Sequence, residues 1–120
     1  MSIDLRPGER LIRRALGNFI NQKWRLPVDG RVYLTDRRFV WKRAFLHLPR
    51  LAESIVEIPL LQITHCEIRG PALIIVAGDT EYWFYIRSGI LALVHYVHGK
   101  TTKEWLEAIH EAAAAPNPTI

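Results

Sequence analysis

Cysteine is nearly absent from this chain, because Cys66 stands alone among 120 residues. A single thiol excludes an internal disulfide framework, and a reducing compartment is the simplest interpretation. Long apolar runs are lacking too. The longest, residues 89–97, is interrupted by His95 and is far shorter than the roughly 20 residues that a membrane-spanning helix requires. The first residues contain no apolar core of signal-peptide length, so we expect a soluble cytoplasmic protein, with peripheral membrane association left open.

The signatures of catalysis are also missing. The sequence has no Gly-rich phosphate loop, no Gly-x-Ser-x-Gly elbow and no carboxylate pair with catalytic placement. His95 and His98 are spaced i, i+3, but no Cys or carboxylate partner stands at metal-ligand spacing. Cys66 lies in an expected strand and is interpreted as a small buried hydrophobe. We therefore expect no enzyme, no cofactor and no metal, and the absence of an RNP-type motif argues against nucleic acid.

What the chain does have is an uneven distribution of charge. The net charge is +4. Residues 1–50 hold 12 Lys/Arg and 4 Asp/Glu, a balance of +8, whereas residues 51–120 hold 4 and 8, a balance of −4. A basic half can concentrate an anionic partner such as a lipid headgroup, nucleic acid or an acidic protein. A solvated surface with charges of both signs is the other interpretation, and the balance alone does not choose between them.

The stretch from Gly30 to Trp41 is the clearest structural signal. Two runs of β-branched and aromatic residues flank the polar sequence Thr-Asp-Arg-Arg at 35–38, a pattern typical of a β-hairpin. Val32 and Leu34 alternate with polar neighbours, as in a half-buried strand. An antiparallel start to the domain is therefore predicted.

The remaining elements follow from turn signals and periodicity. Residues 72–77 and 80–86 read as a second hairpin around Gly-Asp, and the spacing of Thr101 and Glu104 predicts a capping box that starts a helix. Further strands are expected at 55–59 and 62–69, a loop with some extended structure at 17–30, a connector at 44–54, and either strand or helix at 8–16 and 89–98. The fold class is thus mainly β, with one C-terminal helix.

Three pieces of sequence carry a resemblance to a known family. They are residues 30–41, the Ile-Pro-Leu-Leu-Gln-Ile sequence at 58–63, and Tyr-Trp-Phe-Tyr-Ile at 82–86 followed by a helix that contains Trp105 and Ile109. The pair Gly8-Glu9 matches the Gly-Glu with which such domains often open. In this order the pieces resemble the PH-like superfold, specifically GRAM and bacterial PH-like domains, over residues 8–114.

The resemblance implies a bent, seven-stranded antiparallel barrel capped by the helix, with flexible tails at 1–7 and 116–120. Domains of this kind bind membrane lipids or proteins without catalysis, and some bacterial relatives assemble into rings. Fold alone does not give a ligand, so the ligand has to be argued from the residues.

For an anionic lipid or membrane surface, the candidates are cations with one aromatic anchor. Many PH domains that bind phosphoinositides use a Lys/Arg-x-Arg triplet near the first hairpin, and Lys-Trp-Arg at 23–25 resembles it. Guanidinium and ammonium groups suit phosphate, and a Trp settles at headgroup level. A solvated loop, with the Trp packed on the barrel, is the competing interpretation. The full candidate set is Lys23, Trp24, Arg25, Arg37, Arg38, Lys42 and Arg43.

A second hypothesis is a protein-interaction or self-assembly domain without lipid specificity. Apolar residues in the connector and in the 89–97 run would then form an interface with another protein or with a second copy. The same connector residues could instead insert into a membrane or pack on the barrel. The interface candidates are Phe45, Leu46, Leu48, Ile90 and Leu91.

Overall fold

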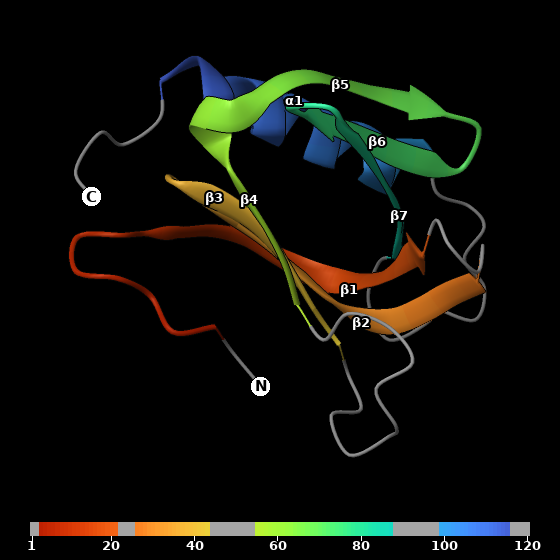
Figure 1. The fold of residues 1–120 in the computed structure, drawn as a ribbon, viewed down its shortest axis with the longest axis horizontal. Helices are drawn as coiled ribbons and strands as arrows, with labels where there is room; N and C mark the ends of the chain where they lie inside the picture. The colour runs from red at the N-terminus through yellow and green to blue at the C-terminus, as the bar shows by residue number, and fades with distance from the viewer. Residues whose placement is uncertain (1–2, 22–25, 44–54, 88–98, 116–120) are drawn as a thin grey trace.

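The computed structural model describes residues 3–21, 26–43, 55–87 and 99–115 of the chain. Seven strands precede one helix, as Figure 1 shows. The elements are β1 (Leu11–Asn21), β2 (Leu26–Thr35), β3 (Arg38–Arg43), β4 (Ile55–Pro59), a 3-10 turn η1 (Leu60–Gln62), β5 (Ile63–Arg69), β6 (Ala72–Ala77), β7 (Thr80–Arg87) and α1 (Gly99–Ala114). The mainly-β class with one C-terminal helix is therefore confirmed.

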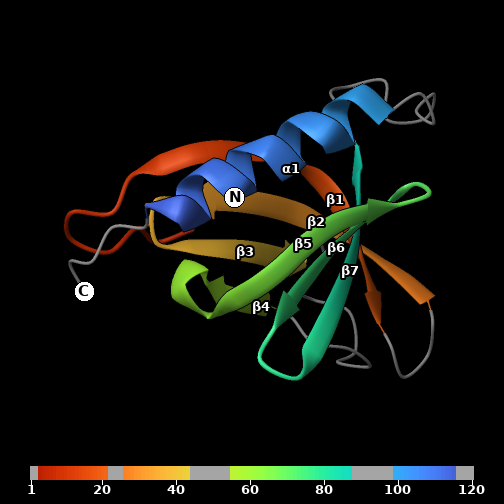
Figure 2. The same cartoon turned by 90° about the horizontal axis from the view of Figure 1, so that it is seen from above.

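All seven strands belong to one antiparallel sheet in the order β4-β3-β2-β1-β7-β6-β5. The long β1 pairs with β2 on one side and with β7 on the other, so it joins the two halves of the sheet. In the figures, the half that contains β2, β3 and β4 lies across the half that contains β5, β6 and β7. Helix α1 packs against β5, β6 and β7 (Figures 1 and 2). The N-terminal residues turn back beneath β1 before that strand begins (Figure 1).

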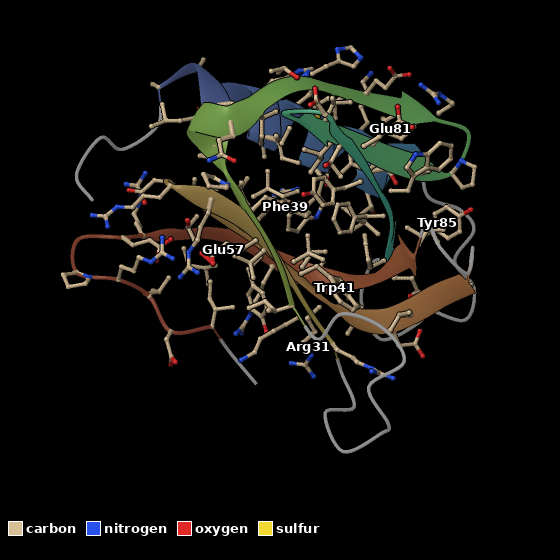
Figure 3. All side chains as sticks on the ribbon, viewed as in Figure 1. Arg31, Phe39, Trp41, Glu57, Glu81 and Tyr85 are labelled. Carbon is tan, nitrogen blue, oxygen red and sulfur yellow. The ribbon has the colours of Figure 1, made fainter. Side chains whose placement is uncertain are left out.

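The core lies between the two halves of the sheet and the helix. Phe39 stands at its centre (Figure 3), with its ring 4.9 Å from that of Phe84 and 6.0 Å from that of Trp105 on α1. Phe19 on β1 contacts both Trp41 and Phe84 at 5.2 and 5.5 Å. Tilted and edge-on ring pairs of this kind add to the stabilisation from apolar burial. The aromatic residues that seemed to mark strands thus tie β1, β3, β7 and α1 together.

Close approach of the strands requires glycine at position 30. The Trp41 ring lies over Gly30, and its Nε1 donates to the carbonyl oxygen of Gly17 at 3.1 Å. A Cβ at position 30 would stand 2.4 Å from Trp41 Nε1 and 2.4 Å from the carbonyl oxygen of Lys42. Only a residue without a side chain fits there, and this explains why the first hairpin begins with glycine.

Two sequence predictions about where elements begin and end are wrong. Residues 17–30 were expected to be a loop with some extended structure, but β1 runs to Asn21 and β2 starts at Leu26. Pairing of β1 with β7 and with β2 outweighs the weak strand propensity of Asn, Asp and Pro. The helix was expected to begin after an N-cap at Thr101, but it begins at Gly99, so this threonine lies inside the first turn. The alternative between strand and helix at 8–16 is resolved as strand from Leu11 onward.

The bent barrel that the resemblance implied is not closed by strand pairing within the described residues. Among the described strands, β4 and β5 form the two ends of the sheet and do not pair with each other. The chain leaves β4 at Pro59, which has no N–H to donate to a ladder, and makes the turn η1 before β5 begins. The helix packs on η1 and β5 and covers this gap with Trp105 and Ile109, both buried.

Within the described residues, no helix is long and apolar enough to cross a membrane.

Candidate functional site: a partly covered basic face

Strands β1 to β4 present two faces that differ sharply in composition. Val32 and Trp41 point into the core and are fully buried. Their sequence neighbours Arg31 and Lys42 therefore point to the opposite, outer face, because side chains alternate along a strand. Figure 3 shows Arg31 projecting on the side of the sheet away from Phe39. Arg31, Arg38 and Lys42 of the first hairpin thus lie on the outer face.

At one end of this face, beside the β2–β3 turn, Arg38 forms a buried ion pair with Glu9. The guanidinium donates from Nε to Oε2 at 2.8 Å and from Nη2 to Oε1 at 3.0 Å. The side chains are 8% and 0% exposed. A fork-to-fork pair of this geometry is among the stronger polar contacts in proteins. It attaches the residues before β1 to a turn almost thirty residues later.

The ionisation of Glu9 follows from these partners. Desolvation by burial raises the pKa of its carboxyl. Hydrogen bonds from Arg38, from the Thr35 hydroxyl at 2.6 Å and from the Arg6 backbone N–H at 2.9 Å outweigh that effect and lower the pKa to about 2. Conversely, the carboxylate of Glu9 raises the pKa of Arg38. Both groups are therefore charged at neutral pH.

Thr35 completes the turn that presents Arg38. Its hydroxyl oxygen accepts hydrogen bonds from the backbone N–H of Arg37 at 3.1 Å and of Arg38 at 3.0 Å while donating to Glu9. Threonine is favoured at turns because its hydroxyl can bond to the backbone a few residues onward. The Thr-Asp-Arg-Arg sequence thus forms the predicted turn, and the same residues bind the N-terminal segment.

A tight turn at Pro7-Gly8 brings Glu9 into position. The Glu9 backbone N–H donates to the Arg6 carbonyl oxygen at 2.9 Å, and Gly8 adopts φ +81°. Proline followed by glycine with positive φ is the pattern of a type II turn. Arg37 Nη2 donates to the Pro7 carbonyl oxygen at 2.8 Å. The Gly-Glu pair noted in the sequence is therefore a turn and an ion-pair partner.

Glu57 on β4 is a second carboxylate at this end of the face. Its Oε2 accepts from Arg6 Nη2 at 2.6 Å and from Arg38 Nη1 at 2.9 Å. Arg38 Nη2 also donates to the Asp4 carbonyl oxygen at 2.9 Å. The guanidinium of Arg38 is thus surrounded by protein acceptors, and the charge of Glu57 is compensated by two arginines.

Ile3 covers the middle of the face. It forms a small buried cluster with Tyr33 and Val40, apart from the main core. We call residues 3–10 the N-terminal strap, because they lie across the outer face and are held by the contacts described above. The expected tail at 1–7 includes five residues of this strap, 3–7.

The strap leaves the other half of the face uncovered. There, one row of directly opposed residues crosses four strands: Leu16 of β1 is opposite Arg31, Arg31 is opposite Lys42, and Lys42 is opposite Ile55 of β4. Leu16 and Ile55 are 38% and 48% exposed, Arg31 is exposed and Lys42 half-buried. We call Leu16, Arg31, Lys42 and Ile55 the basic row. Arg14, two residues before Leu16, adds a third cation on the same face.

The predicted anion-binding residues are separated by the structure. Arg37 and Arg38 lie buried under the strap, whereas Lys42 lies in the basic row and Arg43 is half-buried at the end of β3, opposite Gly30. Whether any of them binds an anion stays a prediction. Several candidates lie outside the described residues, namely Lys23, Trp24, Arg25, Phe45, Leu46, Leu48, Ile90 and Leu91.

Sequence reasoning missed the contributions of Glu9 and Arg31 to this face. Glu9 was noted only as part of a family opening, because nothing in the sequence indicates a partner 29 residues away. Arg31 was not among the site residues selected from the sequence. Its alternation with Val32 and its register opposite Lys42 were the available signals.

The outer face of β5 to β7 has a different surface, which includes two carboxylates, Glu67 and Glu81. Glu67 accepts from His65 Nε2 at 2.6 Å and from Arg69 Nη2 at 3.2 Å, and the hydrogen bond from His65 contributes most to lowering its pKa. Arg69 also lies 5.4 Å from the centre of the Trp83 ring, whose Nε1 donates to Glu81 at 2.7 Å. Arg69 is paired with Glu67 here, so this side offers no excess of positive charge.

Cys66 and the metal-binding residue types give no second candidate site within the described residues. Cys66 is buried, as the sequence predicted, and desolvation raises the pKa of its thiol to about 12. Within residues 3–21, 26–43, 55–87 and 99–115, no three side chains of His, Cys, Asp or Glu gather where they could hold a metal ion. His95 and His98 lie outside these ranges. The basic row is therefore the candidate site that the described structure supports best.

Comparison with known proteins places the fold. No protein-family model and no curated protein sequence matches the chain. Among solved structures, it is similar to the linker-DH/PH domains of p115-RhoGEF (TM-score 0.63, 13% identity), covering 93% of this chain but 31% of that one. It is also similar to the N-terminal PH domain of human ARAP2 (0.61, 12%, covering 90% and 91%) and to that of Vps36 (0.54, 19%, covering 89% and 86%).

These likenesses show a PH-like fold, as the sequence resemblance implied. At 9–19% identity they do not carry a ligand or a partner from those proteins to this chain. Any ligand has to be argued from the basic row, the strap and the charge distribution.

Proposed function

We propose that this chain is a non-catalytic, GRAM-like binding module that associates with the anionic surface of a membrane through its basic face. The observation that carries the proposal is the clustering of cations at one end of the sheet. Lys42 and Arg31 lie opposite each other there, and β1, β2, β3 and β4 all begin or end on that side.

The composition of the two connections between strands at this end of the sheet also supports the proposal. Residues 22–25 connect β1 to β2, and residues 44–54 connect β3 to β4. Together these two connections contain three cations (Lys23, Arg25, Arg50), one carboxylate (Glu53), and apolar residues including Trp24 and Phe45. Cations beside aromatic and aliphatic residues suit the interface of an anionic bilayer.

The test is co-sedimentation of the chain with vesicles of phosphatidylcholine that contain increasing fractions of phosphatidylserine. Binding should rise with the anionic lipid and fall as salt is added, because counterions screen exposed charges. Neutral vesicles are the control. An absence of binding to phosphatidylserine vesicles at low salt would overturn the proposal.

A protein contact is the second candidate, favoured by the open ends of the sheet. Among the described strands, β4 and β5 have a neighbour on one side only, and Leu61 between them is 71% exposed. An unpaired edge strand can accept a strand from another chain. Light scattering over a range of protein concentrations tests self-assembly. A mass that stays that of one chain at the highest concentration removes the homo-oligomer.

A further inference from the structure

We propose that the basic row together with Arg14 docks flat against an anionic bilayer, so that the outer sheet face itself is the membrane-binding surface. This inference rests on the proposed function and specifies its contact surface. A soluble headgroup held in a pocket between the loops is the arrangement it replaces.

The register gives the row its fixed geometry. Leu16, Arg31, Lys42 and Ile55 occupy directly opposed positions on four hydrogen-bonded strands, so their Cα atoms follow one line with neighbours about 5 Å apart. Hydrogen-bonded ladders on both sides hold the two central strands. Two adjacent cations between two aliphatic side chains on a rigid sheet match a charged plane better than they match one phosphate group.

The chemistry of the row favours a bilayer over other polyanions. Its two cations are flanked at both ends by exposed aliphatic side chains, Leu16 and Ile55. Nucleic acid and acidic proteins would be attracted by the cations but would bury these aliphatic groups against charged or polar partners at a cost. At a membrane interface, by contrast, aliphatic side chains enter the acyl boundary while cations remain among the headgroups.

The strap makes the remaining part of the face compatible with this orientation. Glu57, the carboxylate next to Ile55 on β4, is compensated by Arg6 and Arg38 and does not repel an anionic surface. The uncovered half carries three cations, Arg14, Arg31 and Lys42, and one carboxylate, Asp29, and both Lys42 and Asp29 interact with other groups in the structure. Three positive charges against one negative charge give this half a positive potential.

The decisive experiment compares two double variants with equal charge change. Arg31→Ala/Lys42→Ala removes both cations of the row, and Arg69→Ala/Lys103→Ala removes two cations from β5 and α1, away from it. Each Lys or Arg near an anionic bilayer strengthens binding roughly fivefold. The row variant should therefore lower the partition coefficient on phosphatidylserine-containing vesicles roughly 30-fold. The decrease caused by the control variant should be several times smaller.

The aliphatic side chains are tested separately. Leu16→Ser/Ile55→Ser keeps every charge, so it should reduce the binding that survives at high salt while leaving the salt-sensitive part unchanged. An environment-sensitive dye on Ile55→Cys, in a Cys66→Ala background, should report transfer to an apolar environment when vesicles are added. Far-ultraviolet circular dichroism of each variant confirms that the sheet is intact.

The outcomes separate this inference from the proposed function. If the unaltered chain binds the vesicles but both double variants bind equally well, the row is not the contact surface, although the function stands. Competition by soluble inositol phosphates would indicate a headgroup pocket and overturn flat docking. Equal affinity for an acidic polypeptide or for RNA, with no effect of Leu16→Ser/Ile55→Ser, would overturn the choice of a bilayer.

Discussion

Arg38 on β3 and Glu9 in the N-terminal strap form an ion pair through two parallel hydrogen bonds of 2.8 and 3.0 Å, and neither side chain is more than 8% exposed. The pair lies on the same face as the basic row, but its charges are used within the protein. Four N–H···O contacts join Arg38 to Glu9, Glu57 and Asp4. Arg38 therefore has a structural role, and whether it also binds an anion stays a prediction.

Removing one partner of this pair should be costly. Arg38→Met leaves the Glu9 carboxylate buried without its main partner, and we expect a loss of about 3 kcal/mol in the free energy of unfolding. Urea denaturation measures it. Arg10→Ala, an exposed arginine in the same strap, is the control and should change the value by less than about 0.5 kcal/mol.

The double variant Arg38→Met/Glu9→Gln distinguishes a charge effect from simple loss of packing. Because it removes both charges, it should be more stable than Arg38→Met alone. If the double variant is less stable by the sum of the two single losses, the ion pair is not the origin of the effect.

Acid should weaken the fold through Glu9. The pKa of its carboxyl is about 2 in the folded chain and 4.5 as a reference for the unfolded chain. A lowered pKa stabilises the fold above pH 4.5, and this contribution is lost progressively as the pH falls towards 2. The difference corresponds to roughly 3 kcal/mol. Urea denaturation of Glu9→Gln over the same pH range should lack this part of the pH dependence.

Alanine substitutions at three glycines distinguish the stability cost of steric crowding from the cost of backbone strain. Gly30→Ala should be the most damaging, because its Cβ would stand 2.4 Å from a backbone oxygen and from Trp41. Gly78→Ala meets no atom within 4 Å but has φ +62°, so only backbone strain of about 1 kcal/mol applies. Gly8→Ala combines φ +81° with a 2.9 Å approach to Arg37 and should lie between them. Thermal unfolding tests this order, and equal losses at positions 30 and 78 would contradict it.

The single thiol should be protected from modification. Cys66 is buried and the pKa of its thiol is about 12, so little thiolate exists at pH 8 and access is restricted. A disulfide reagent should react much more slowly with the folded chain than with the chain in urea. Rapid reaction without denaturant would show that β5 opens readily.

Local signals predicted the hairpins, since the residues that define them lie next to each other in sequence. The turn at Thr35 and the second hairpin around Gly78 were confirmed. Val32 and Leu34 do share the core face, but the prediction of a half-buried strand was wrong there, because Tyr33 on the other face is buried against Ile3. Strand β1 extends beyond its expected end because its pairing partners supply the stabilisation. Weak local propensity is commonly overridden in this way.

The candidate site was predicted less well, because it depends on contacts between distant residues. Basic residues on the first hairpin were recognised, but their division into Arg38, held by Glu9, and the exposed Arg31 is decided by the strap. The partner of Arg38 lies 29 residues away and that of Arg6 lies 51 residues away. No periodicity or motif encodes such pairs, whereas register would have aligned Arg31 with Lys42.

The strap also has a consequence for the rates of folding and unfolding. Glu9 can bind only after Thr35, Arg37 and Arg38 have formed their turn, so we expect the strap to dock late, after the transition state for folding. Contacts absent from the transition state slow unfolding but do not accelerate folding. We therefore expect the ion pair between Glu9 and Arg38 to slow unfolding and so to lengthen the lifetime of the native sheet.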